Sequence, residues 1–297
     1  MARRAIASAL AAIALWGTLA TLVLRLKHMP PFLLLGCGMV LGGLCGARHL
    51  TLRGLRPGAL LLGIYGLFVY HACLFAGLRL APPLEANLLN YLWPLLIVLL
   101  SPVFISSATL GPRHVLGALL GFSGAALLVT GGHFGFDARN TPGYLLSITA
   151  AIIWATYSLL AKRRGGFPTA SISLFCLVTG ALSLGCHALF ETRYVPAPTE
   201  IPPLLLIGLG PLGAAFYLWD RALTEGDSRV VGTLAYLTPL LSTVLVAASG
   251  EGTLTGVSVA AMVLIIGGAM IGSWTRRSKD QQMEGPTEVA RVIDGTR

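Results

Sequence analysis

A short uncharged stretch from Asn87 to Leu96 contains side chains that could bind a polar ligand. On a helix, Asn87, Asn90, Tyr91 and Pro94 are spaced i, i+3, i+4 and i+7 and therefore share one face, with Trp93 on its flank. The amides can hydrogen-bond to a polar group, and the aromatic rings can contact an apolar one. The pattern favours reversible binding, although ordinary helix packing would also accommodate it.

This stretch recurs 145 residues later as Gly232 to Leu241, with six of the eight residues from 89 to 96 unchanged. Proline removes a backbone donor, so Pro94 is expected to free the carbonyl of Asn90, and Pro239 that of Ala235. Matched interruptions in two halves of a membrane chain indicate the central site of a transporter. We therefore interpret the two prolines as hinges.

Two further groups of residues complete the candidate site. His71 is an ionisable residue at membrane depth, which indicates function unless a neutral imidazole simply bonds to a neighbouring helix. Trp154, Tyr157 and Ser158 share a helix face, which could instead belong to an interfacial aromatic belt. The predicted substrate-binding residues are His71, Asn87, Asn90, Tyr91, Trp93, Trp154, Tyr157 and Tyr236, with Pro94 and Pro239 as hinges.

The composition requires a membrane around these residues. The chain has 297 residues, of which 55% are hydrophobic and 11% charged, against about 25% charged in soluble proteins. Apolar runs long enough to span a bilayer predict ten helices and an all-α membrane protein. They lie near 5–24, 31–50, 57–78, 84–104, 112–131, 141–162, 169–190, 201–222, 229–249 and 254–274.

The formal charge of +9 reflects topology and not a nucleic-acid partner. If the N-terminus is cytoplasmic, 16 of the 21 Lys and Arg residues fall on the cytoplasmic side and 5 on the other. This asymmetry follows the positive-inside rule and predicts a multi-pass protein of the inner membrane with both termini cytoplasmic. Asp220 and Arg221, at the end of the eighth span, are interpreted as a local anchor.

Cofactor and enzyme signatures are not found in the sequence. All five cysteines fall inside predicted spans and none has CxxC spacing, so neither a zinc site nor a disulfide framework is expected. His71 has no acid or nucleophile at a useful spacing, and no GxxxxGK[ST] phosphate loop occurs. We predict a protein that is not an enzyme, has no catalytic residue, and binds no metal or other cofactor.

Weaker sequence correspondences extend the repeat over more of the chain. Trp16-Gly17-Thr18 corresponds to Trp154-Ala155-Thr156 at an offset of 138, and Gly63, Leu67 and Leu78 correspond to Gly208, Leu212 and Leu223 at an offset of 145. Residues 1–135 and 136–274 are therefore predicted to be two five-helix repeats, followed by a flexible cytoplasmic tail at 275–297. An odd number of spans per half makes the repeats inverted.

Small residues at four-residue spacing indicate where helices pack closely. They are Gly38, Gly42 and Gly46 in the second span, Gly117 and Gly121 in the fifth, and Gly268 and Gly272 in the tenth.

The ten spans, the repeat and the Tyr-Leu-X-Pro-Leu-Leu segment resemble the EamA-type members of the drug/metabolite transporter superfamily. The segment from Asn90 to Pro94 resembles most the YddG-like aromatic amino-acid exporters within that group. The resemblance implies a carrier that exports amino acids, aromatic or otherwise apolar, through the bilayer by alternating access. A buried imidazole favours its neutral form, so we expect no obligatory proton coupling through His71. The alternative is a multidrug antiporter for lipophilic cations.

Overall fold

The computed structural model describes residues 2–47, 57–133, 135–250 and 253–273, and within these ranges every regular element is a helix. Nine described helical segments are long and apolar enough to cross a membrane. The second predicted span is represented by a 15-residue apolar helix, α3 (Pro31–Cys45), which is shorter than the others. The predicted tail at 275–297 lies outside the described residues.

The helices follow one another through short connections. In chain order they are α1 (Ala2–Gly17), α2 (Leu19–Leu24), α3, α4 (Pro57–Gly63), the π-helix η2 (Ile64–Val69), α5 (Tyr70–Leu80), α6 (Pro83–Asn90), α7 (Leu92–Phe104), α8 (Pro112–Thr130), η3 (Ala138–Asn140), α9 (Thr141–Arg163), α10 (Thr169–Phe190), η4 (Pro198–Glu200), α11 (Ile201–Leu209), the π-helix η5 (Gly210–Ala214), α12 (Ala215–Glu225), α13 (Ser228–Leu234), α14 (Leu237–Ala248) and α15 (Gly256–Ser273).

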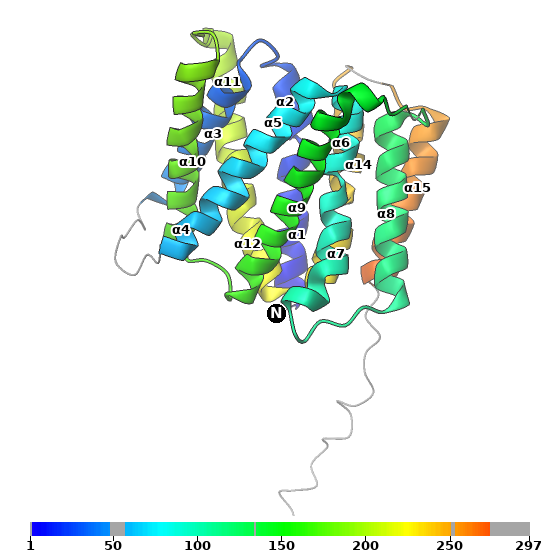
Figure 1. Cartoon of the computed structure of the whole chain (residues 1–297). Coiled ribbons are helices and arrows are strands. Elements are labelled where there is room, and N and C mark those ends of the chain that lie inside the picture. The colour runs from blue at the N-terminus through cyan, green and yellow to red at the C-terminus, as the bar shows by residue number, and fades with distance from the viewer. Residues whose placement is uncertain (1, 48–56, 134, 251–252, 274–297) are drawn as a thin grey trace, which may run out of the picture.

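The helices form a bundle with two flanks around a central group (Figure 1). On one flank α3 packs along α10 and α11, and on the other α8 packs along α15. Between them, α1 contacts α12 and α14, while α9 contacts α5 and α7. The helix α1 begins and α15 ends at the same end of the bundle, which we call the N-terminal side.

Two of the long spans are broken near the middle. The first break separates α6 from α7 at Tyr91, and the second separates α13 from α14 at Ala235 and Tyr236. Pro94 and Pro239 lie in the first turn of the second helix in each pair, where a missing N–H costs least. The breaks therefore precede the predicted hinge prolines by about one turn.

One expectation about these prolines is wrong. The carbonyl of Ala235 is not left free, because it accepts a hydrogen bond from the backbone N–H of Thr238 at 3.0 Å. A tightened turn of this kind is common where a helix ends, and it compensates for the donor that proline lacks.

Close packing of the flanks depends on glycine, as the four-residue spacing predicts. A Cβ atom at Gly117 of α8 would lie 2.7 Å from the carbonyl oxygen of Gly268 and from the Cα of Gly272 in α15. A Cβ at Gly42 of α3 would lie 2.4 Å from the carbonyl oxygen of Leu212 in η5. These glycines let backbones approach in lipid, where dispersion and not water exclusion drives helix association.

Candidate functional site

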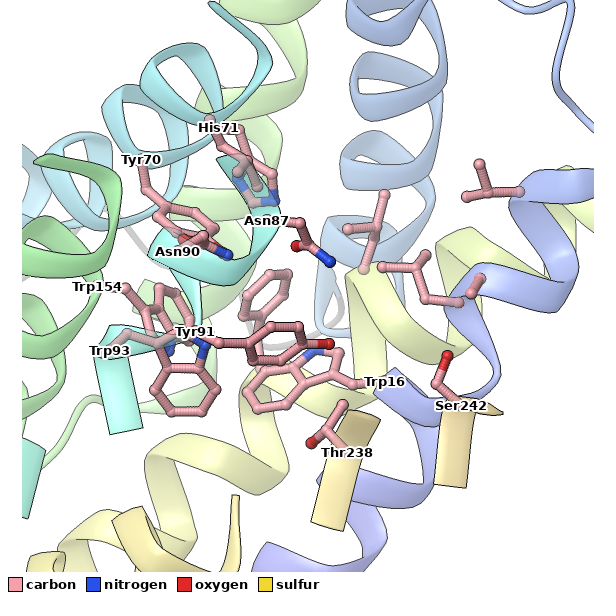
Figure 2. A pocket seen from close by; sticks show the side chains of 16 residues that line it. Trp16, Tyr70, His71, Asn87, Asn90, Tyr91, Trp93, Trp154, Thr238 and Ser242 are labelled. Atoms are coloured by element: carbon pink, nitrogen blue, oxygen red, sulfur yellow. The ribbon is translucent and has the colours of Figure 1, made fainter. Parts of the chain in front are cut away.

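A cavity of about 320 Å³ lies in the central group of helices, beside the break between α6 and α7 (Figure 2). This volume lies within the range of small-molecule sites. Its lining comprises Trp16, Leu19, Ala20, Val23, Tyr70, His71, Leu74, Asn87, Asn90, Tyr91, Trp93, Trp154, Leu212, Phe216, Thr238 and Ser242. Both halves of the chain contribute to the wall, so the site requires their association.

The cavity extends toward the end of the bundle opposite the N-terminal side. Its α1 and α2 residues run from Trp16 to Val23, near the end of the first span. Its α6 residue Asn87 lies near the beginning of the fourth span, and the two spans run in opposite directions. Val23 is 38% exposed, whereas Trp154 is 3% exposed. Access therefore comes from the opposite side, and the inner end is closed.

Four tryptophans close that inner end. Trp16, Trp93, Trp154 and Trp219, which we call the tryptophan floor, have ring centroids between 5.2 and 6.5 Å apart. Most of these ring pairs meet edge to face, the arrangement that the aromatic quadrupole favours. The tryptophan floor presents aromatic rings to a ligand in the cavity. It also separates the cavity from the N-terminal side of the bundle.

The polar groups of the wall include two unpaired atoms. Asn90 donates its amide N–H to the hydroxyl of Tyr70 at 3.4 Å, while its Oδ1 is buried without a hydrogen-bond partner among the described residues. The hydroxyl of Thr238 is likewise buried and unpaired within the described part of the chain. Because buried polar atoms are normally satisfied, these two are candidates for hydrogen bonds to a ligand.

The cavity wall carries no charged side chain. The lining residues include no Asp, Glu, Lys or Arg. A ligand with a net charge would lose its hydration there without meeting a counter-charge, which is costly. A ligand of zero net charge, with polar groups at one end and an apolar remainder, fits this wall.

His71 takes a defined tautomer beside the cavity. Its Nδ1 lies 2.6 Å from the carbonyl oxygen of Leu67, one turn earlier on the same span. Because a carbonyl only accepts, Nδ1 carries the proton and Nε2 of a neutral ring is an acceptor. The π-helix η2 immediately precedes this residue, and such turns often occur at functional sites. Among the described residues, His71 hydrogen-bonds within its own span and not to a neighbouring helix.

The structure brings together six of the eight predicted binding residues in the cavity wall: His71, Asn87, Asn90, Tyr91, Trp93 and Trp154. Tyr157 is not in that wall; it lies behind Trp154, with ring centroids 5.4 Å apart. Tyr236 is fully buried away from the cavity against Gly121 of α8. Pro94 and Pro239 are buried behind the two breaks.

Ten lining residues were not among the predicted site residues, and the aromatic and hydroxyl-bearing ones among them are Trp16, Tyr70, Phe216, Thr238 and Ser242. Trp16 could have been found, because it is the counterpart of Trp154 in the repeat. Thr238 occupies the position of Trp93 in the second copy, which is also a usable signal. Phe216 is the counterpart of His71 at the offset of 145, so the repeat could have indicated it as well, and the packing of α12 against α1 places it in the wall.

Comparison with known proteins gives consistent matches. The model of the EamA-like transporter family matches residues 3–130 and again residues 141–274. The chain is 42% identical over 275 residues to the aromatic amino acid exporter YddG of Ancylobacter novellus, covering 90% of this chain and 96% of that protein. It is 30% identical to the exporter of the same name from Salmonella typhimurium, covering 80% and 86%. A crystal structure with 41% sequence identity covers 92% of this chain and 98% of its own, with a TM-score of 0.86.

Proposed function

The chain belongs to the EamA-like transporter family, and from this premise we propose that it exports amino acids with aromatic or other apolar side chains. It is a membrane transporter and not an enzyme. Export proceeds by alternating access, with the two halves moving about the breaks near Pro94 and Pro239, and without obligatory proton coupling. The partners are the small-molecule substrate and the lipid bilayer, with no nucleic acid.

The observation that carries this proposal is the pairing of an uncharged wall with unsatisfied polar atoms above the tryptophan floor. An amino acid is a zwitterion of zero net charge, so it matches a wall without counter-charges. Its ammonium can donate to Asn90 Oδ1, while the amide of Asn87 and the hydroxyls of Tyr91 and Thr238 can donate to its carboxylate. Its side chain then contacts the rings of the floor.

The second candidate is a multidrug carrier for lipophilic cations. Aromatic rings attract cations, so the tryptophan floor is compatible with that chemistry. A cation would nevertheless enter a cavity whose lining has no carboxylate. The relatives named as aromatic amino acid exporters also support the first candidate.

Several features support two inverted five-helix repeats at 1–135 and 136–274, with α3 counted as the tenth crossing helix. The family model matches each half separately. The breaks at Tyr91 and Tyr236 and the π-helices η2 and η5 recur at the same offset of 145. The contact of α1 with α12 mirrors that of α9 with α5, as an internal two-fold axis requires.

The basic residues support an inner-membrane protein with both termini in the cytoplasm. The described residues on the N-terminal side include Arg3, Arg4, Arg113, Lys162, Arg163, Arg164, Arg221 and Arg229, and those at the opposite end are Arg25, Lys27, Arg79, Arg139 and Arg193. The excess on the N-terminal side follows the positive-inside rule. The cavity then opens away from the cytoplasm.

The test is transport by the full chain in proteoliposomes. Counterflow of radiolabelled phenylalanine is measured against unlabelled amino acids, and uptake of a lipophilic cationic dye is measured separately. Exchange with aromatic and apolar amino acids, and no uptake of the dye, is the expected result. Uptake of the dye together with no exchange of amino acids would replace the first candidate by the second.

A further inference from the structure

Beneath the cavity, two further spaces continue toward the N-terminal side. The first lies between α9 and α12 and is lined by Trp154, Tyr157, Ser158, Ala161, Phe216, Trp219, Asp220 and Leu223. It shares Trp154 and Phe216 with the cavity and leaves no room for a water molecule. The second, of about 390 Å³, lies at the α9–α10 connection and shares Asp220 with the first. The three spaces therefore lie in series.

Six of the eight residues that line the closed space are counterparts of residues that line the open cavity. The α1 and α2 wall of the cavity consists of Trp16, Leu19, Ala20 and Val23, and an offset of 138 converts these into Trp154, Tyr157, Ser158 and Ala161. An offset of 145 converts His71 and Leu74 of the cavity into Phe216 and Trp219. All six counterparts line the closed space.

Inverted repeats provide the reason for this correspondence. Two halves with similar folds can each adopt the conformation of the other. The space that is open beside one half then closes, and its counterpart beside the other half opens. On this argument the closed space between α9 and α12 becomes the open vestibule in the other state of the transporter.

Asp220 is the one acidic side chain among the residues that line this space. Because α12 continues to Glu225, Asp220 lies more than a turn before the end of the helix, and not at the helix end that the sequence suggested. Its Oδ2 accepts a hydrogen bond from the backbone N–H of Phe167 at 3.1 Å. Its Oδ1 is buried and has no partner among the described residues. A buried carboxylate with a free oxygen is a strong site for an ammonium group.

We propose that the space between α9 and α12 is the substrate passage to the N-terminal side, and that Asp220 is an ammonium-binding subsite within it. This inference rests on amino-acid export as the function of the chain. An amino acid that enters through the pocket beside the α9–α10 connection meets Asp220 first. It passes to the uncharged cavity when the floor rearranges.

Two contacts between α9 and α12 keep the passage closed in this state. The ammonium group of Lys162 donates hydrogen bonds to the carbonyl of Leu223 at 2.7 Å and to the carbonyl of Gly226 at 2.5 Å. Trp219 donates its indole N–H to the hydroxyl of Ser158 at 3.1 Å. Opening the passage requires both contacts to break, as expected for a gate that links the two helices.

The first experiment tests the passage by thiol labelling. Ala161→Cys places a thiol in the closed space, and a membrane-impermeant maleimide is supplied from the N-terminal side of oriented vesicles. Native Cys176, which is fully buried, is the internal control. Labelling of Ala161→Cys at least about five times faster than Cys176 is expected. Equal and slow labelling of both thiols would overturn the passage, whatever the substrate.

The second experiment tests the subsite by phenylalanine transport. Asp220→Asn retains an acceptor for the N–H of Phe167 but loses the charge, so the half-saturating phenylalanine concentration should rise about tenfold. Asp137→Asn, which removes an exposed carboxylate that lines none of the three spaces, should stay within about twofold of wild type. Asp220→Glu restores the charge and should recover most of the affinity.

These outcomes separate the inference from the proposed function. If Asp220→Asn has the same half-saturating phenylalanine concentration as wild type, the subsite is excluded. An equal loss of phenylalanine affinity in Asp220→Asn and Asp220→Glu would also overturn the subsite, because that pattern indicates a structural role. If wild-type protein does not transport phenylalanine or any other amino acid, the proposed function fails and the ammonium subsite fails with it. The labelling of Ala161→Cys would still decide the passage.

Discussion

Tyr236 donates its hydroxyl to the main-chain carbonyl of Tyr91 at 3.3 Å, so the second helix break is bonded directly to the first. The two tyrosines are counterparts in the repeat, 145 residues apart. Tyr91 faces the cavity, whereas Tyr236 is buried between α7 and α8. One member of the pair therefore lines the cavity, and the other bonds to the backbone of its counterpart.

Replacement of Tyr236 by Phe should impair both stability and transport. The variant loses one hydrogen bond to the carbonyl of Tyr91, which should cost roughly 0.6 to 1 kcal/mol. Thermal unfolding in detergent and phenylalanine counterflow are the measurements. Tyr65→Phe is the matched control, because it removes a hydroxyl bonded to Thr156 at 2.8 Å outside the cavity. Equal transport by both variants would show that the bond between the breaks has no functional role.

Replacement of Asn90 by Leu should weaken substrate binding with little change in volume. A hydrogen bond to a charged ammonium contributes about 1.5 kcal/mol or more, so the half-saturating concentration should rise at least tenfold. Asn140→Leu serves as the control, since Asn140 also donates to a tyrosine hydroxyl, that of Tyr144, at 3.4 Å but lies outside the cavity. An unchanged concentration in Asn90→Leu would exclude this amide from the binding site.

Transport should proceed equally well without a pH gradient. His71 donates Nδ1–H to the carbonyl of Leu67, and the amide of asparagine can imitate that donor without titrating near neutral pH. His71→Asn should therefore retain flux down a phenylalanine gradient. Accumulation of phenylalanine that requires a pH gradient in wild type and is abolished in His71→Asn would establish proton coupling through this residue.

Asp227, in the connection between α12 and α13, should make stability depend on pH in the acid range. Burial alone would raise the pKa of Asp227, but hydrogen bonds from the Arg229 side chain and backbone N–H at 2.9 Å outweigh it and lower that pKa. A carboxyl group with a lowered pKa contributes stability above its unfolded value, near 4, and loses it as the pH falls through the folded value.

Unfolding temperature measured between pH 3 and pH 7 tests this expectation. Asp227→Asn should show a smaller loss of stability on acidification than wild type. Asp137→Asn is the matched control, because Asp137 caps its own short helix in the same way and pairs with Arg139 on an exposed surface. Identical acid profiles for Asp227→Asn and wild type would contradict the assignment.

The sequence alone determined the fold class and much of the site, because both follow from local patterns. Apolar runs of about 20 residues can only be buried in a bilayer, and this alone predicts the long helices. The i, i+3, i+4 spacing places Asn87, Asn90 and Tyr91 on one face, and the cavity receives all three. The repeat further indicated that the two broken spans belong to one site.

Only the tertiary structure decided which equivalent residues face the cavity. Trp154 and Tyr157 lie on one helix face, yet only Trp154 reaches the cavity, because α12 packs against that face and covers Tyr157. Tyr91 and Tyr236 occupy matching positions but have different environments, since Tyr91 lines the cavity whereas Tyr236 is packed against α7 and α8. Internal sequence symmetry specifies counterparts, whereas the conformational state breaks that symmetry through contacts between helices distant in the chain.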